Sequence, residues 1–167
     1  LNGPVRTSSI YDGEEYDARL EMPGWDKPGF DDSRWSRVAV RPVCGTVALT
    51  PKPFVPVRKT GELHPLSVTQ PVPGRFVFDL GQNMVGWAAL KMPVEKGRTV
   101  TLRFAEMLNP DGTLYTANYR SAKSTDSYTA SVTGVAKWEP VFTFHGFRYV
   151  ELSGLSSGAA PELTWVK

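Results

Sequence analysis

Acidic and aromatic side chains gather near the start of the sequence, between residues 11 and 35. Residues 11–32 hold eight acidic and two basic residues, although the whole chain of 167 residues has a formal net charge of only +2. Four aromatic residues accompany them: Tyr11, Tyr16, Trp25 and Trp35. Carboxylates bind hard cations and accept hydroxyl hydrogens, whereas aromatic faces stack on the apolar C–H faces of sugar rings. The stretch therefore suits a polyhydroxylated ligand, a cation, or both.

The carboxylates of residues 11–19 are close enough in sequence to suggest a cation site. Calcium takes six to eight oxygen ligands, so several carboxylates would have to converge. The spacing fails the EF-hand pattern because Tyr16 stands where a third ligand is needed. Any calcium site would therefore be assembled from several loops. The alternative is an acidic strand edge at which Asp17 pairs with Arg19.

Two further segments offer ligand contacts, and each also has a purely structural interpretation. Trp25 and Trp35 flank residues 28–32 and predict either a wall for a sugar or a plug at one end of a β-sandwich. Residues 78–87 place two amides between Gly81 and Gly86, which predicts a hairpin tip between two strands. The side chain of Asn83 would otherwise be available to a ligand.

Other kinds of chemistry receive little support. The histidines are His64 and His145, and His145 lies in an aromatic strand where a structural role is expected. The sequence contains neither a Gly-x-Ser-x-Gly elbow nor a phosphate-binding glycine loop. The single Cys44 excludes an internal disulfide framework and a cysteine zinc cluster. A carboxylate pair for glycoside hydrolysis stays open, because any chain with 17 acidic residues contains candidates.

Composition limits the partners. Nineteen Lys and Arg residues against 17 Asp and Glu give no basic excess for nucleic-acid binding. Uncharged apolar runs are far shorter than the roughly 18 residues that a membrane-spanning helix needs. We therefore expect neither nucleic acid nor membrane as a partner, and the compartment stays open.

The elements that must position these residues are strands. Residues 98–107 and 141–152 alternate apolar and polar side chains with the period of a half-buried strand. Fifteen Gly and 14 Pro interrupt the chain between short apolar runs. Further strands are predicted at residues 15–21, 37–43, 54–59, 66–70, 75–79, 86–91 and 127–131. One helical turn is expected within residues 24–35, and residues 41–73 are expected to cross between sheets. The pattern favours an all-β, antiparallel sandwich or jelly roll with little helix.

The ends predict a piece of a longer protein. The chain starts at Leu1 rather than at Met, and residues 162–167 read like the middle of a strand. We expect residues 1–167 to form a single β-sandwich domain taken from a larger multidomain enzyme.

Seven short motifs in order resemble one family. They are Ile10–Glu14 with Tyr16–Arg19, Gly24–Trp25, Phe30–Trp35, Phe78–Trp87, Ala105–Leu108 with Asp111–Tyr115, Asp126–Thr129 and Phe142–Val150. Together they cover residues 3–155. They resemble the non-catalytic N-terminal β-region of bacterial α-L-rhamnosidases, glycoside hydrolase family 78. The resemblance implies an antiparallel jelly-roll β-sandwich that is galactose-binding-domain-like.

The resemblance implies an accessory domain without hydrolytic activity of its own, because the family's catalytic acids lie on a separate (α/α) barrel. Some members carry the domain as a carbohydrate-binding module of family 67, which binds L-rhamnose through calcium; in others the sandwich is structural and packs on the barrel. The implied partners are L-rhamnose or a rhamnosylated glycan, and the barrel and other domains of the parent chain. The implied calcium ligands are Asp12, Glu14 and Asp17, and the implied carbohydrate-binding residues are Tyr16, Trp25, Trp35 and Asn83.

Overall fold

The computed structural model describes residues 3–42, 45, 48–155 and 162–166. The strands are β1 (Val5–Ser9), β2 (Gly13–Asp17), β3 (Glu62–Leu63), β4 (Ser67–Val72), β5 (Arg75–Val94), β6 (Thr99–Ala105), β7 (Met107–Leu108), β8 (Leu114–Tyr115), β9 (Thr125–Thr129), β10 (Gly134–Trp138), β11 (His145–Ser153) and β12 (Glu162–Val166). The helical elements described are two 3-10 turns, η1 (Ala18–Leu20) and η2 (Ala117–Tyr119). The prediction of an all-β fold with little helix is confirmed. Among the described residues, no helix has the length and apolar character that a membrane crossing requires.

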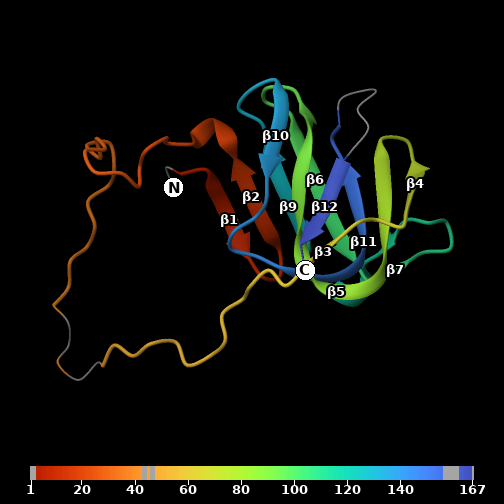
Figure 1. The fold of residues 1–167 in the computed structure, drawn as a ribbon, viewed down its shortest axis with the longest axis horizontal. Coiled ribbons are helices and arrows are strands. Elements are labelled where there is room, and N and C mark those ends of the chain that lie inside the picture. The colour runs from red at the N-terminus through yellow and green to blue at the C-terminus, as the bar shows by residue number, and fades with distance from the viewer. Residues whose placement is uncertain (1–2, 43–44, 46–47, 156–161, 167) are drawn as a thin grey trace.

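Ten strands form one curled sheet, and β7 pairs with β8 separately (Figure 1). The main path through the sheet runs β1-β2-β9-β6-β11-β5-β12-β3, with β4 and β10 also pairing with β5. β2 runs parallel to β9, and the other paired strands described are antiparallel. The expected antiparallel pairing is thus confirmed except between β9 and β2, the strand that carries Glu14, Glu15 and Asp17.

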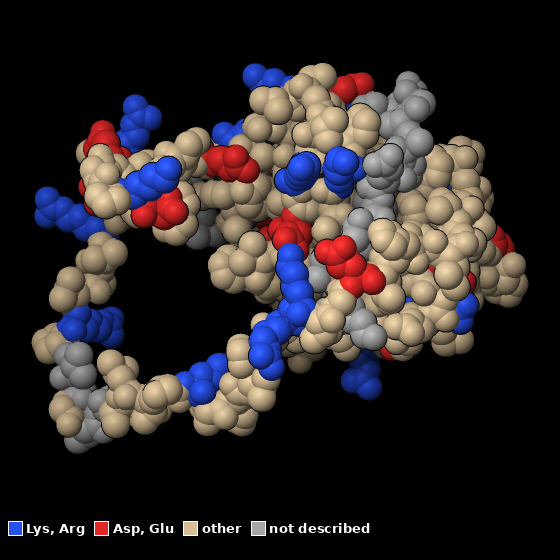
Figure 2. Space-filling view, viewed as in Figure 1, with Lys and Arg blue, Asp and Glu red and all other residues tan. Residues whose placement is uncertain are grey.

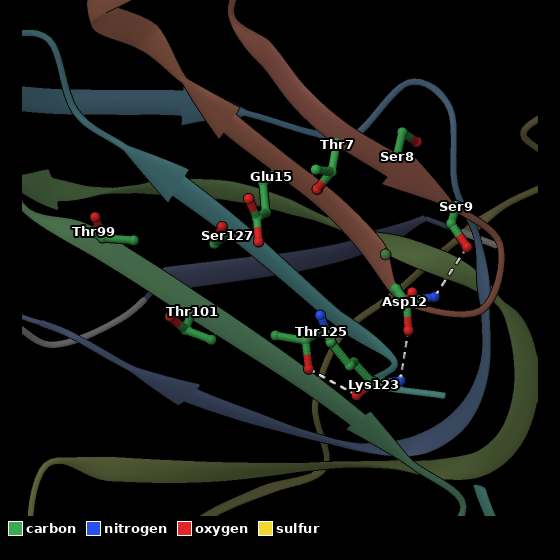
Figure 3. Close-up of a pocket in the computed structure, with 11 residues that line it drawn as sticks. Thr7, Ser8, Ser9, Asp12, Glu15, Thr99, Thr101, Lys123, Thr125 and Ser127 are labelled. Carbon is green, nitrogen blue, oxygen red and sulfur yellow. Dashed lines mark hydrogen bonds between the residues drawn. The ribbon is translucent and has the colours of Figure 1, made fainter. Parts of the chain in front are cut away.

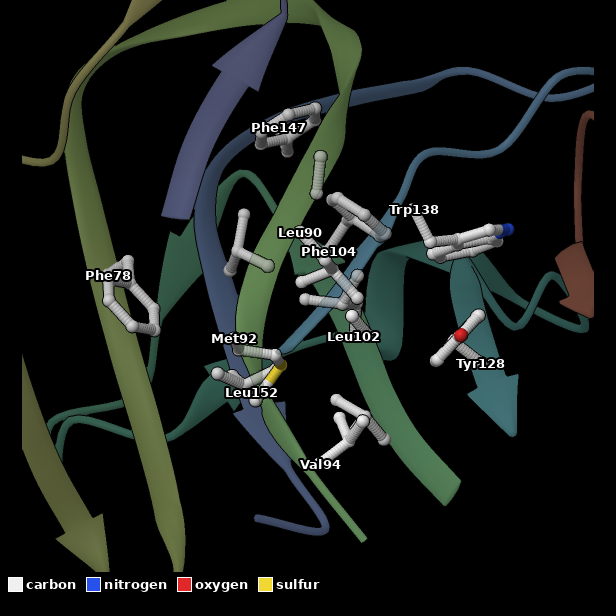
Figure 4. Close-up of a cluster of buried hydrophobic side chains, with 14 of the residues drawn as sticks. Phe78, Leu90, Met92, Val94, Leu102, Phe104, Tyr128, Trp138, Phe147 and Leu152 are labelled. Atoms are coloured by element: carbon white, nitrogen blue, oxygen red, sulfur yellow. The ribbon is translucent and has the colours of Figure 1, made fainter. Parts of the chain in front are cut away.

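The 20-residue strand β5 connects the two layers of the sheet. Its first part pairs with β4 and β11, whereas its second part pairs with β10 and β12. Because β5 belongs to both sets of pairs, the sheet curls and encloses a core between its layers (Figure 4). Inward-facing side chains of β5, β6, β9, β10 and β11 fill this core, among them Phe78, Leu90, Met92, Leu102, Phe104, Tyr128, Trp138, Phe147 and Leu152.

The hairpin tip predicted within residues 78–87 is wrong, because β5 continues through this segment. Asp79 lies opposite Tyr149 and Met84 lies opposite Phe147, so Leu80–Asn83 form a wide bulge facing the single Arg148. Gly81 permits the bulge with a φ of 78°. The carboxylate of Asp79 stabilises it by accepting the Gly81 N–H at 2.7 Å and a bidentate pair of hydrogen bonds from Arg148 at 2.8 and 2.9 Å.

Two other predicted strands are also wrong. The described residues of 37–43 and 54–59 belong to no strand or helix, and Val43 lies outside the described residues. We call residues 36–61 the arm, of which 36–42, 45 and 48–61 are described. The arm arcs away from the strands and does not cross between the two layers (Figure 1). Its prolines 42, 51, 53 and 56 lack the N–H that strand pairing needs.

The start of the chain joins the sheet through a hairpin that the residue pattern did not predict. β1 pairs with β2, and β2 then pairs with β9. The strand expected over residues 15–21 begins earlier and ends at Asp17, whose side chain accepts the Arg19 N–H and starts η1. Residues 24–35 form turns, although a helical turn was expected there. A strand at residues 162–166 is present as predicted, and Lys167 lies outside the described residues.

Candidate functional site

A cavity of about 540 Å³ lies beside β1 and β2, under the loop of residues 21–35. It brings together three of the four predicted carbohydrate-binding residues, Tyr16, Trp25 and Trp35. Two carboxylates and a further aromatic ring also line it: Glu21, Asp26 and Phe142. We call this cavity the aromatic pocket.

Tyr16 forms one wall of the aromatic pocket and is held in place by two contacts. Its ring stacks on Tyr128, with the ring centres 6.0 Å apart and the planes 11° from parallel. Its hydroxyl donates a hydrogen bond to Glu21 Oε1 at 2.8 Å. Burial and the bond to Glu21 raise the pKa of Tyr16 well above its usual value. The phenol therefore stays protonated and neutral, and its position is held from two sides.

The two indoles come from the loop and present accessible faces. Trp25 is 61% exposed and Trp35 is 40% exposed, so neither plugs the sandwich as the structural alternative required. The loop is held by local turns, in which the Trp35 N–H donates to Asp32 O at 2.8 Å and the Trp25 N–H donates to Met22 O at 3.1 Å. Trp35 also packs against Phe30, with the ring centres 5.6 Å apart. The rings are thus positioned without being covered.

This arrangement suits a ligand with one apolar face and several hydroxyl groups. Aromatic faces carry partial negative charge and attract the weakly positive C–H bonds of a sugar ring or methyl group. The carboxylates of Glu21 and Asp26 accept hydrogen bonds only, so they match hydroxyl donors. A mostly apolar cavity with a few polar groups is the usual form of a small-molecule site.

Asn83, the fourth predicted carbohydrate-binding residue, lies elsewhere. It is part of the bulge in β5, and its amide donates a hydrogen bond to Glu106 Oε1 at 3.0 Å. It is not among the residues that line the aromatic pocket. Its contribution to sugar binding stays a prediction, and any such contact would lie outside this pocket.

The three predicted calcium ligands face three different surroundings. Asp12 accepts the Lys123 backbone N–H at 3.2 Å. Asp17 binds the guanidinium of Arg19 through both carboxylate oxygens at 2.8 and 2.7 Å, and these hydrogen bonds lower its pKa. The side chain of Glu14 is completely buried. Within the ranges that the structure describes, three or more His, Cys, Asp or Glu side chains nowhere converge on a possible metal position. The three residues therefore do not fit one calcium site.

Asp12 instead borders a second cavity of about 410 Å³ on the face of β1, β2, β6 and β9 (Figure 3). Most of its lining side chains carry hydroxyl groups: Thr7, Ser8, Ser9, Thr99, Thr101, Thr125 and Ser127. Side chains alternate between the two faces of β6, so Thr99 and Thr101 lie on the face away from the buried side chains of Val100 and Leu102. What the sequence did not reveal is that β1 and β2 extend this polar face.

A buried polar network joins β2, β9 and β11. Asp126 Oδ1 accepts the Glu14 N–H at 2.9 Å and lies 3.0 Å from His145 Nε2. Because a carboxylate only accepts, Nε2 carries the hydrogen of that bond. The Ser124 hydroxyl lies 3.3 Å from His145 Nδ1 on the other side of the ring. His145 is thus a core histidine with polar partners on both nitrogens, as its aromatic strand predicted.

The order Ser124, His145, Asp126 is that of a nucleophile, a base and an orienting carboxylate, but all three residues are buried. Their exposed fractions are 8%, 4% and 0%. The imidazole also stacks on Phe104, with the ring centres 4.1 Å apart. The contacts of the network connect β2, β9 and β11 within the core.

The buried carboxyl group of Glu14 makes the free energy of unfolding depend on pH. Its carboxylate accepts the Phe142 N–H at 3.0 Å, yet burial raises its pKa above the usual value near 4.5. Between the two pKa values the folded chain keeps a proton that the unfolded chain has released. The free energy of unfolding therefore falls as the pH rises through this window, by up to about 1.4 kcal/mol per pH unit.

We expect Glu14→Gln to remove this contribution. Urea unfolding at a series of pH values from about 4.5 upward should show a shallower decline for the variant than for the natural chain. The matched control is Glu15→Gln, on the exposed side of the same strand, which should keep the natural slope. Equal slopes for the natural chain and Glu14→Gln would contradict this assignment.

Comparison with known proteins places the chain in a family. Residues 69–167 match the family model described as the bacterial alpha-L-rhamnosidase concanavalin-like domain, and residues 1–61 match the alpha-L-rhamnosidase N-terminal domain. The two matched regions share one sheet here, because β2 from the first pairs with β9 from the second.

Relatives that align with nearly the whole chain support the same family. An alpha-L-rhamnosidase from Formosa agariphila is 52% identical over 165 residues, which are 99% of this chain and 18% of that protein. The crystal structure of Streptomyces avermitilis alpha-L-rhamnosidase complexed with L-rhamnose superposes with a TM-score of 0.86 and 48% identity, over 98% of this chain and 16% of that one. The structure from "Dictyoglumus thermophilum" superposes with a TM-score of 0.82 and 37% identity, over 96% and 19%. The chain thus spans less than a fifth of the length of these relatives, and it belongs to the bacterial α-L-rhamnosidase family.

Proposed function

We propose that residues 1–167 serve as a non-catalytic accessory region of a longer α-L-rhamnosidase and bind L-rhamnose or a rhamnosylated glycan in the aromatic pocket. In this proposal the hydrolytic acids belong to a catalytic (α/α) barrel outside these residues. The observation that carries it is the convergence of Tyr16, Trp25 and Trp35 beside the carboxylates of Glu21 and Asp26.

The chemistry of the sugar matches that of the pocket. The 6-methyl group and the C–H bonds of L-rhamnose would lie against the exposed indole faces of Trp25 and Trp35. Its hydroxyl groups would donate to Glu21 and Asp26, which only accept when ionised. The bound L-rhamnose in the Streptomyces avermitilis relative belongs to a protein roughly six times longer than the matched region, so it supports the ligand class rather than this pocket.

Isothermal titration with L-rhamnose tests the proposal. We expect a dissociation constant between micromolar and millimolar, equivalent to about −8 to −4 kcal/mol. Trp25→Ala and Trp35→Ala should each weaken binding by about tenfold or more, because each removes a stacking face. Tyr11→Ala is the matched control: Tyr11 is 69% exposed and does not line the pocket, so it should leave the affinity unchanged. No heat at millimolar sugar with the folded chain would reject rhamnose binding.

Calcium-assisted binding stays a prediction from the resemblance and is tested by the same titration. Because Asp12, Glu14 and Asp17 have separate partners, we expect binding to persist after chelation with EDTA. Loss of binding on chelation, its restoration by calcium, and the same loss in Asp12→Ala would establish the metal instead.

A second candidate function is structural packing against the catalytic barrel. Val141 and Phe142 favour it, because they are 70% and 66% exposed on consecutive residues and form part of an apolar surface. This function predicts no response to rhamnose at any concentration. The titration therefore separates the two candidates.

A further inference from the structure

The arm combines apolar side chains with nearly complete exposure. Every described residue from 31 to 62 is exposed. Large apolar residues of the arm are 66–90% exposed: Val38, Val40, Leu49, Phe54, Val55 and Val57. Contiguous apolar surface of this kind is unfavourable in water and is characteristic of a contact region.

The charge of the arm has one sign. Between Ser33 and Gly61 the sequence contains six Lys or Arg residues and neither Asp nor Glu. Figure 2 shows basic side chains distributed along the arm where it stands away from the body. A surface that covers the arm must therefore offer apolar area together with carboxylates.

The far end of the arm is attached to the body of the protein. At the far end, Lys59 Nζ lies 2.7 Å from Glu139 Oε1 and 5.9 Å from the centre of the Trp87 ring. Trp87 Nε1 donates to the other oxygen of Glu139 at 2.8 Å. At the near end, Trp35 precedes the arm, packs on Phe30 of the same loop and lines the aromatic pocket with Tyr16 of β2. The arm is thus an internal connection between the aromatic pocket and β3 rather than a free tail.

The body presents apolar surface between these two ends. Val57 shares a cavity with Trp87, Val141, Phe142 and Phe144. Phe142 also lines the aromatic pocket, which contains Trp35 at the near end of the arm. Apolar side chains therefore continue from Val57 of the arm, through Phe142, to the aromatic pocket. We call Val141, Phe142 and Phe144 the Phe142 surface.

We propose that the arm and the Phe142 surface together clasp another domain of the same, longer polypeptide, one that presents an apolar groove bordered by Asp and Glu. This rests on the proposed membership of a longer rhamnosidase, whose relatives have more than four fifths of their length outside the matched region. A domain on the same chain meets the arm at high effective concentration, so a contact of moderate area suffices.

Amide hydrogen exchange compares the isolated chain with the full-length polypeptide that contains it, both without sugar. We expect the backbone amides of residues 48–61 to exchange at least about tenfold more slowly in the full-length polypeptide, because covered amides are protected. In the full-length polypeptide, Phe54→Asp should return the neighbouring residues 55–59 to fast exchange. Val132→Asp is the control: Val132 is 63% exposed outside the arm, and its replacement should leave the protection of the arm unchanged.

Each other outcome overturns the proposal. Equally fast exchange of the arm in both proteins would show that nothing covers it. Protection that appears only with dimer formation in analytical ultracentrifugation would assign the arm to a second copy of the chain. The exchange experiment contains no rhamnose, so equally fast exchange in both proteins would not affect the conclusion from the sugar titration. Likewise, a titration without heat would not affect the conclusion about protection of the arm.

Discussion

Replacing Gly13 with alanine is expected to lower the free energy of unfolding by about 4 kcal/mol or more. Gly13 begins β2 with a φ of 101°, which L-residues rarely adopt. An added Cβ would lie against the carbonyl oxygen of Thr125 and 2.6 Å from Asp126 Oδ1. Both neighbours are fixed, one by the backbone of β9 and the other by its bonds to Glu14 and His145. The backbone of β2 would have to move away from β9.

The control for this prediction is Gly74→Ala, which separates backbone strain from steric conflict. Gly74 has a φ of 77°, but nothing lies within 4 Å of the position that its Cβ would occupy. It should therefore lose only about 1–2 kcal/mol, the cost of the left-handed conformation. Urea unfolding of the natural chain and both variants measures the difference. Similar losses in the two variants would contradict the close approach of β2 to β9.

We expect Asp126→Ala to lower the free energy of unfolding by about 3–5 kcal/mol, a large fraction of the 5–15 kcal/mol typical of a domain. Asp126 is completely buried, and its Oδ1 accepts from Glu14 N–H and His145 Nε2–H. Removing the carboxylate leaves both donors without that acceptor, in a place that water does not reach. Thermal and urea unfolding should both report the loss.

Two further variants determine whether the buried acceptor is responsible. Asp126→Asn keeps one acceptor oxygen and should lose less than Asp126→Ala. Asp111→Ala removes an aspartate of an exposed turn, which accepts the Thr113 N–H at 3.0 Å, and should lose about 1 kcal/mol. If Asp126→Ala behaved like Asp111→Ala, the network would contribute nothing beyond an ordinary surface hydrogen bond.

The network also explains why two family regions fold here as one sheet. Glu14 belongs to the region matched by the N-terminal domain, whereas Asp126 and His145 belong to the concanavalin-like domain. Backbone bonds reinforce the connection, since Thr125 N–H donates to Asp12 O at 2.9 Å and Ser124 N–H donates to Tyr11 O at 3.0 Å. The acidic stretch near the start of the chain therefore contributes to the connection between the two regions.

The aromatic pocket and the Phe142 surface are neighbours, and this matters for both proposals. Phe142 lines the pocket on one side and lies beside Val57 of the arm on the other. A domain clasped by the arm would therefore border the aromatic pocket. Measuring the rhamnose affinity of the isolated chain and of the full-length polypeptide would show whether that domain completes the pocket or covers it.

Local residue patterns were sufficient to predict the type of fold and to group three aromatic residues that line one cavity. The alternation of Val100, Leu102 and Phe104 identified β6 because a strand exposes successive side chains to opposite faces. Tyr16, Trp25 and Trp35 lie close together in the sequence, and the fold brings them to one cavity, while their role in carbohydrate binding stays a prediction. The extra residues opposite Arg148 and the absence of strands in the described part of the arm were missed, because glycine and proline mark an interruption without specifying its shape.

The sequence by itself determined that this chain is all-β, that it carries the motifs of α-L-rhamnosidases, and that acidic and aromatic residues lie together near its start. Only the tertiary structure determined where each carboxylate lies and what it contacts. Asp12 faces a polar cavity, Glu14 is buried beneath the backbone of Phe142, and Asp17 pairs with Arg19. Residues close in sequence diverge here because β2 alternates its faces, ends at Asp17, and pairs on one side with β9, which lies more than a hundred residues away in the sequence.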